Sequence, residues 1–126
     1  MHGLTHIGIQ VKDLAISERF YVEALGCSKS GKIETGDVRI AFLEFANGTI
    51  ELVQPLGASE PVHHGPFMHL AFEVVDVQVE YKRIKSLGAE MIDTEPRAFS
   101  DGHLFFFKGP DGEFIEFCNG IRIDPV

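Results

Sequence analysis

Hydrophobic residues occupy every second position near the start of the chain, at Ile7, Ile9 and Val11. A period of two predicts a β-strand with one apolar face. The next segment changes to a helical spacing, with an apolar stripe formed by Ile16, Phe20, Tyr21 and Ala24. Asp13 is placed to cap this helix at its N-terminus, and Gly26 suits its C-terminal stop.

The same succession of patterns occurs a second time. Segment 68–77 aligns with segment 5–14, and each leads into a helical stretch that ends in Leu-Gly. In the second stretch Asp76 is the expected cap and Gly88 the expected stop. Three strand-like segments follow each helix, at about 29–35, 37–46 and 49–54, and at about 90–95, 103–108 and 113–118. The stretch 97–102 between them is expected to be a loop that covers the site.

These elements predict an α+β protein built from two βαβββ modules, at about 4–54 and 67–119. Tight-turn signals at Asn47-Gly48 and Asp111-Gly112 join the last two strands of each module. A Pro- and Gly-rich stretch at about 55–66 is the expected linker. The length of 126 residues suits a single domain over 1–126.

Composition narrows the class of partner. The 11 Lys and Arg against 19 Asp and Glu give a net charge of −8, so no basic surplus exists to bind nucleic acid. Every apolar run is shorter than the ~18 residues that a membrane span needs. The start shows no basic segment followed by an apolar one, and the two cysteines are far apart. We therefore expect a cytoplasmic protein that acts on a small molecule, with neither a membrane nor a nucleic acid as partner.

Strand alternation places four polar side chains opposite the helix-facing residues, at His6, Glu51, His69 and Glu116. A lone strand histidine is more often hydrogen-bonded than a metal ligand, and a lone glutamate is more often solvated. Here the two modules carry matching pairs, which chance seldom supplies. Two imidazoles and two carboxylates suit one divalent ion per site, with zinc, nickel or cobalt favoured and manganese or iron compatible.

Alternation also assigns four further residues to the cavity side. Arg39 is expected to pair with a substrate carboxylate, the alternative being a salt bridge with Asp37 or Glu44. His103 is either a proton shuttle or a polar residue at the mouth of the cavity. Phe105 and Phe107 are expected to form an apolar wall.

Four sequence segments carry a family resemblance: HIGI at 6–9, RFYVEALG at 19–26, HLAF at 69–72 and PDGEFIEF at 110–117. They resemble the vicinal oxygen chelate superfamily, which includes glyoxalase I, methylmalonyl-CoA epimerase, extradiol dioxygenases, and fosfomycin and bleomycin resistance proteins. The resemblance extends over residues 4–119. It implies paired βαβββ modules whose mixed sheet curls around one divalent metal.

The ligand set narrows what the resemblance implies. Four protein ligands, with a carboxylate at Glu51, are similar to those of glyoxalase I and methylmalonyl-CoA epimerase, which move a proton next to a carbonyl or thiohemiacetal oxygen. Similarity to glyoxalase I implies Glu116 as the base and Glu51 as its counterpart in the other module. The alternatives are an epimerase-like enzyme and a non-catalytic protein that binds a small molecule in the same cleft. Uncovered sheet edges lead us to expect a homodimer.

Overall fold

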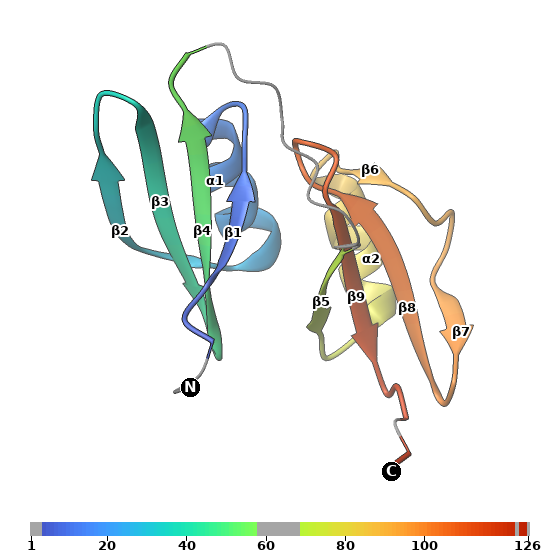
Figure 1. The fold of residues 1–126 in the computed structure, drawn as a ribbon. Coiled ribbons are helices and arrows are strands. Elements are labelled where there is room, and N and C mark those ends of the chain that lie inside the picture. Colours follow the sequence, from blue (N-terminus) through green and yellow to red (C-terminus); the bar gives the residue numbers. More distant parts are fainter. Residues whose placement is uncertain (1–3, 58–68, 123, 126) are drawn as a thin grey trace. The chain divides into compact units, whose positions relative to one another are not determined.

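Both halves of the chain follow the same order of elements. The computed structural model describes residues 4–57, 69–122 and 124–125, which form two compact units, Met1–Gly65 and Pro66–Val126. Each unit has one helix and one mixed sheet, as the sequence predicts (Figure 1). Most of the predicted linker at about 55–66 lies outside the described residues.

The first unit contains one helix and four strands: β1 (Ile7–Gln10), α1 (Leu14–Leu25), β2 (Ser28–Glu34), β3 (Val38–Phe45) and β4 (Gly48–Pro55). The strand order is β1-β4-β3-β2. β1 runs parallel to β4, and the other neighbours are antiparallel. The helix α1 packs on β3 and β4, so one face of the sheet is covered (Figure 1).

The second unit repeats this arrangement with one additional strand: β5 (His69–Glu73), α2 (Val77–Ser86), β6 (Glu90–Met91), β7 (Arg97–Phe99), β8 (Gly102–Lys108) and β9 (Phe114–Asn119). The strand order is β5-β9-β8-β6, and β7 pairs with β8. The helix α2 packs on β8 and β9. Neither helix in the described part of the chain has the length and apolar character needed to cross a membrane.

Both predicted helix boundaries are confirmed. The Asp13 carboxylate accepts the Ile16 N–H at 3.1 Å, and the Asp76 carboxylate accepts the Val79 N–H at 3.0 Å. Each bond satisfies a backbone donor that the first turn leaves unpaired. Gly26 and Gly88 have φ of 69° and 84°, a left-handed conformation that glycine adopts without steric cost.

The segment after α2 differs from the expected strand and loop. Regular pairing of β6 ends at Met91, and the Asp93 carboxylate accepts the Phe106 N–H at 2.7 Å in place of a backbone carbonyl. Pairing resumes at Arg97, so β7 forms within the stretch 97–102 that the sequence predicts as a loop. A side-chain acceptor thus replaces one ladder bond and divides the predicted strand 90–95.

The core of each unit lies between its helix and its sheet. Its fully buried members include Tyr21, Leu43, Ile50 and Leu52 in the first unit and Ile84, Phe105, Phe107 and Ile115 in the second. Ile50, Leu52 and Ile115 are on the strand faces that the sequence assigns to the helix side. The sheet faces that carry His6, Glu51, His69 and Glu116 are therefore turned away from the helices, as predicted.

Candidate functional site

The first unit brings a histidine and a glutamate together on the face turned away from α1. His6 precedes β1, and Glu51 lies on β4 directly opposite Gly8. The Nε2 atom of His6 is 2.7 Å from Oε2 of Glu51. The other ring nitrogen, Nδ1, is 3.0 Å from Oγ1 of Thr5. Both ring nitrogens are thus engaged, which holds the imidazole against the carboxylate.

The second unit presents an equivalent pair. His69 begins β5, and Glu116 lies on β9 directly opposite Ala71. Ala71 follows His69 by two positions, just as Gly8 follows His6, so the pairing register is the same in both units. His69 is exposed and Glu116 is half-buried, which leaves both side chains accessible on this face.

A phenylalanine accompanies each pair. Phe42 lies directly opposite Glu51, and its ring centroid is 6.4 Å from that of His6 at an interplanar angle of 90°. Phe106 lies directly opposite Glu116, and its ring is 5.2 Å from His69 at 86°. The sequence analysis missed both residues. Directly opposed residues of an antiparallel pair point to the same side, so counting back from each turn would have found them.

The predicted wall of Phe105 and Phe107 is wrong. Both rings are fully buried on the helix side of the second sheet, where Phe105 packs edge-on against Tyr81 of α2 at 5.2 Å. Phe105 is directly opposite Phe117, a core residue, and therefore shares its face. His103 belongs to the same alternation but is exposed, beside Asn119 near the end of β9. These three residues are not on the face of Glu116.

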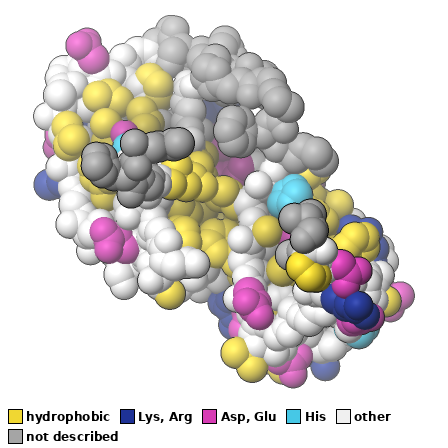
Figure 2. Space-filling view, turned by 60° about the horizontal axis from the view of Figure 1, so that its bottom comes forward, with side chains coloured by type: hydrophobic (Ala, Val, Ile, Leu, Met, Phe, Trp, Pro, Cys, Tyr) yellow, Lys and Arg dark blue, Asp and Glu magenta, His cyan; other side chains and the backbone are white. Residues whose placement is uncertain are grey.

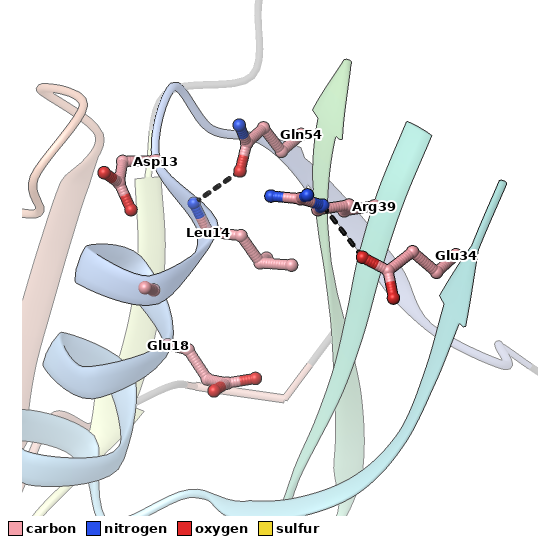
Figure 3. A pocket seen from close by; sticks show the side chains of 7 residues that line it. Asp13, Leu14, Glu18, Glu34, Arg39 and Gln54 are labelled. Carbon is pink, nitrogen blue, oxygen red and sulfur yellow. Dashed lines mark hydrogen bonds and ion pairs between the residues drawn. The ribbon is translucent and has the colours of Figure 1, made fainter. Parts of the chain in front are cut away.

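Arg39 is also on the helix side rather than the predicted cavity side, because it is directly opposite Gln54. Its Nε is 2.9 Å from Oε1 of Glu34, so it forms a salt bridge, although not with Asp37 or Glu44. Arg39, Glu34 and Gln54 line an open pocket of about 290 Å³ together with Asp13, Leu14, Ala15 and Glu18 of the α1 end (Figure 3). This pocket lies on the opposite face of the sheet from His6 and Glu51.

The acidic character of the second face affects a neighbouring thiol. Burial, and then the charges of Glu116 and Glu73, raise the pKa of Cys118. The neutral thiol is therefore favoured beside the carboxylates. On the face drawn in Figure 2, hydrophobic side chains gather in patches, with single acidic and basic side chains around them.

The donor set fits a divalent transition metal. Each unit supplies one imidazole nitrogen donor and one carboxylate on the same face, and mixed nitrogen and oxygen sets of this kind suit zinc, nickel and cobalt. Within the described residues, no three His, Cys, Asp or Glu side chains assemble as ligands.

Two βαβββ units with matched His and Glu pairs define the class of fold, and comparison with known proteins identifies the family. Residues 3–117 match the model of the Glyoxalase/Bleomycin resistance protein/Dioxygenase superfamily. The chain belongs to this family, which confirms the resemblance seen in its sequence and the α+β fold class.

The similar proteins cover nearly the whole chain. The uncharacterized protein YwbC of Bacillus subtilis is 36% identical, over 90% of this chain and 94% of its own. A probable lactoylglutathione lyase of Vibrio cholerae is 30% identical, over 91% and 88%. The mitochondrial methylmalonyl-CoA epimerase of Bos taurus is 23% identical, over 96% and 71%. Among solved structures, an E144Q mutant of glyoxalase I from Zea mays has a TM-score of 0.82 at 25% identity, over 93% of this chain and 45% of that one.

Proposed function

We propose that this protein is a metal-dependent lyase or isomerase of the glyoxalase I type. Its substrate would be a 2-oxoaldehyde–thiol hemithioacetal or a similar small molecule with an oxygen next to an acidic carbon. The observation that carries the proposal is the matched His and Glu pair on the helix-free face of each unit. The 30% identity to a probable lactoylglutathione lyase supports it.

One divalent ion would be held by His6, Glu51, His69 and Glu116. Zinc, nickel or cobalt suits the set best, and manganese or iron is compatible with it. When bound, such an ion would supply Lewis-acid polarisation of a substrate oxygen, which makes the neighbouring carbon more acidic.

The chain itself supplies the base. The Glu116 carboxylate removes the proton from the acidic carbon and returns it to the adjacent carbon, so the isomerisation consumes no net proton. Glu51 is the equivalent carboxylate of the first unit and serves as its counterpart. Phe42 and Phe106 lie directly opposite these two glutamates and give each carboxylate an apolar neighbour.

A second candidate is an epimerase that acts on a carboxylated acyl thioester. The 23% identity to methylmalonyl-CoA epimerase over 96% of this chain favours it. Proton removal by Glu116 is common to both candidates, but an epimerase delivers a proton to the opposite face of the same carbon, which requires a second acid group on that face. We further propose, as expected from the sequence, that the protein is a single domain and acts in the cytoplasm as a homodimer.

The test is proton exchange in metal-reconstituted protein. Wild-type protein and Glu116→Gln are incubated in deuterated buffer with methylglyoxal and a thiol, and exchange at the substrate carbon is followed by NMR. We expect Glu116→Gln to retain most of the metal by elemental analysis and to lose exchange by about 100-fold or more, the range of a general base. Glu80→Gln, on α2 at the other side of the sheet, is the matched control and should exchange normally.

Three outcomes would contradict the proposal. Full turnover by Glu116→Gln would exclude that residue as the base. Undiminished ligand binding after chelator treatment, with no exchange, would favour the non-catalytic binding protein. Exchange of a methylmalonyl thioester but not of the hemithioacetal would select the epimerase.

A further inference from the structure

Arg97 lies beside the candidate site of the second unit. It begins β7 and is directly opposite Leu104 of β8. Its guanidinium carbon is 5.8 Å from the ring centroid of Phe106, the same ring that His69 contacts edge-on at 5.2 Å. The guanidinium and the imidazole are thus both near the same phenyl ring, on the Glu116 side of the sheet.

The Arg97 side chain is held in place by Asp93. Its Nε is 2.8 Å from Oδ1 of Asp93, while Oδ2 of the same carboxylate accepts the Phe106 N–H at 2.7 Å. The backbone carbonyl of Asp93 accepts the Tyr81 hydroxyl at 3.0 Å. The Asp93 side chain is only 14% exposed, against 53% for Arg97. A fixed carboxylate thus positions a guanidinium whose outer part faces solvent.

The hairpin that carries Arg97 is itself anchored. A Cβ on Gly102 would lie 2.0 Å from the carbonyl oxygen of Asn119, so β8 approaches the end of β9 closely at this point. In the turn between β7 and β8, the Ser100 hydroxyl donates to the Arg122 carbonyl at 3.2 Å. These contacts connect the β7–β8 hairpin to the end of β9 and to the residues that follow it.

The guanidinium retains donors for a ligand. Arginine has five N–H donors in a planar fork, and Asp93 occupies the one on Nε. In the described part of the chain, Asp93 is the one carboxylate that pairs with Arg97. The terminal nitrogens match the two oxygens of a carboxylate, and stacking on an aromatic ring is characteristic of arginine at such sites.

A cation is needed here if the substrate is anionic. Glu116 and Glu73 lie on this face, and the whole chain carries a net charge of −8, so an anion would be repelled without local compensation. Among the described strand residues of this sheet, Lys108 is the other cation on this side, but its ammonium group is 3.3 Å from the Glu90 carboxylate at the far end of β8.

We propose that Arg97 binds a carboxylate of the substrate and thereby selects substrates that carry one. The inference rests on the proposed function for the identity of the site, but the binding of a carboxylate by Arg97 does not require turnover. Arg97 is thus a specificity-determining residue, and Asp93 is the residue that positions it.

The experiment compares methylmalonate with its uncharged diamide as probes, added to zinc-loaded and to metal-free protein. Binding is followed by NMR at the Arg97 Nε–H and the Phe106 amide, and affinities are obtained from the titrations. We expect Arg97→Ala to weaken methylmalonate binding about 10- to 100-fold, the loss typical of a charged hydrogen bond. Arg97→Lys should restore part of it, and binding of the diamide should not change.

Arg39→Ala is the matched control. Arg39 is also 53% exposed and also pairs through Nε with a carboxylate, at 2.9 Å, but it lies on the helix side of the first sheet. The Arg39→Ala variant should bind methylmalonate with the affinity of the wild type. An equal loss in Arg39→Ala, a loss in Lys108→Ala instead of Arg97→Ala, or a stronger response to inorganic phosphate than to methylmalonate would overturn the assignment.

The two proposals fail separately. Zinc-loaded protein whose methylmalonate affinity is unchanged by Arg97→Ala would overturn the role of Arg97 and leave the proposed function intact. Protein that takes up no zinc, but whose methylmalonate binding depends on Arg97, would overturn the proposed function and support the carboxylate subsite.

Discussion

At the scale of single residues, burial controls the ionisation of Cys27. This thiol is 4% exposed, and burial raises its pKa. Below the pKa of the unfolded chain, about 8.5, the thiol is protonated in both states and its contribution to stability is complete. At higher pH the unfolded chain loses the proton while the folded protein keeps it, so the free energy of unfolding must fall as the pH rises.

We therefore expect the stability of the wild type to decrease more steeply between pH 8 and 10 than that of Cys27→Ala. The difference in slope should approach about 1.4 kcal/mol per pH unit at most. Urea denaturation of both proteins across this range measures it. The substitution also leaves a small cavity, so the slopes are compared rather than the absolute stabilities. Parallel slopes would show that Cys27 ionises equally in the two states.

Residue placement also marks the limit of what the sequence predicts. Alternation correctly assigned the faces of His6 and Glu116, because the apolar residues next to them, Ile7 and Ile9 or Ile115 and Phe117, recur at every second position. It misassigned Arg39 and Phe105 because both strands contain apolar residues on both faces, which removes the period-two signal. Cross-strand pairing resolves this ambiguity, since Arg39 and Phe105 are directly opposite Gln54 and Phe117. In a strand with apolar residues on both faces, the pairing with the neighbouring strand shows which residues face the helix.

At the scale of elements, the β7–β8 hairpin depends on a glycine. Gly102 has no room for a side chain, because a Cβ would meet Asn119 O at 2.0 Å and the Gly120 carbonyl carbon at 2.5 Å. Both contacts are with backbone, which cannot move as a side-chain tip does. We expect Gly102→Ala to destabilise the protein by about 1–3 kcal/mol, the usual cost of overpacking.

Gly36→Ala is the control for this substitution. A Cβ on Gly36 has nothing within 4 Å, and its φ is not in the left-handed region. Its unfolding free energy in urea should stay within about 0.5 kcal/mol of the wild type. Hydrogen exchange should additionally show faster opening of β7 in Gly102→Ala. Equal stabilities of the two variants would mean that the close approach to β9 is not maintained in solution.

The elements themselves were largely predictable. The caps Asp13 and Asp76 and the stops Gly26 and Gly88 define both helices through local backbone chemistry. The segment around Asp93 was not predictable, because its course depends on a side-chain bond to Phe106, thirteen residues away. Arg97 was consequently expected in a covering loop, and its place beside Phe106 emerges only from the structure.

At the scale of the whole molecule, the proposed metal joins residues that are 63 positions apart in a repeated sequence, His6 and His69. The repeat predicts that both modules contribute equally to the site, since each offers one imidazole and one carboxylate in the same register. It predicts nothing about substrate, because the residue that we propose to select it, Arg97, has no counterpart in the repeat pattern.

Shared ligation makes a quantitative prediction for thermal unfolding. A ligand that binds only the folded state at 100 times its dissociation constant adds about 2.7 kcal/mol to stability. For a chain of this size, that free energy corresponds to a rise in Tm of roughly 10 °C. We expect saturating zinc to produce such a rise in the wild type, and a chelator to reverse it. Differential scanning calorimetry measures the shift.

The variants His6→Ala and His69→Ala test whether one zinc ion is bound by histidines of both units. Each should lose most of the zinc-dependent shift, and by similar amounts, because each removes one imidazole from the same coordination sphere. His103→Ala is the control, since His103 is an exposed histidine that does not share the Glu116 face, and it should keep the full shift. Loss of the shift in only one of the first two variants would assign the ion to a single unit, and the four-residue site would have to be abandoned.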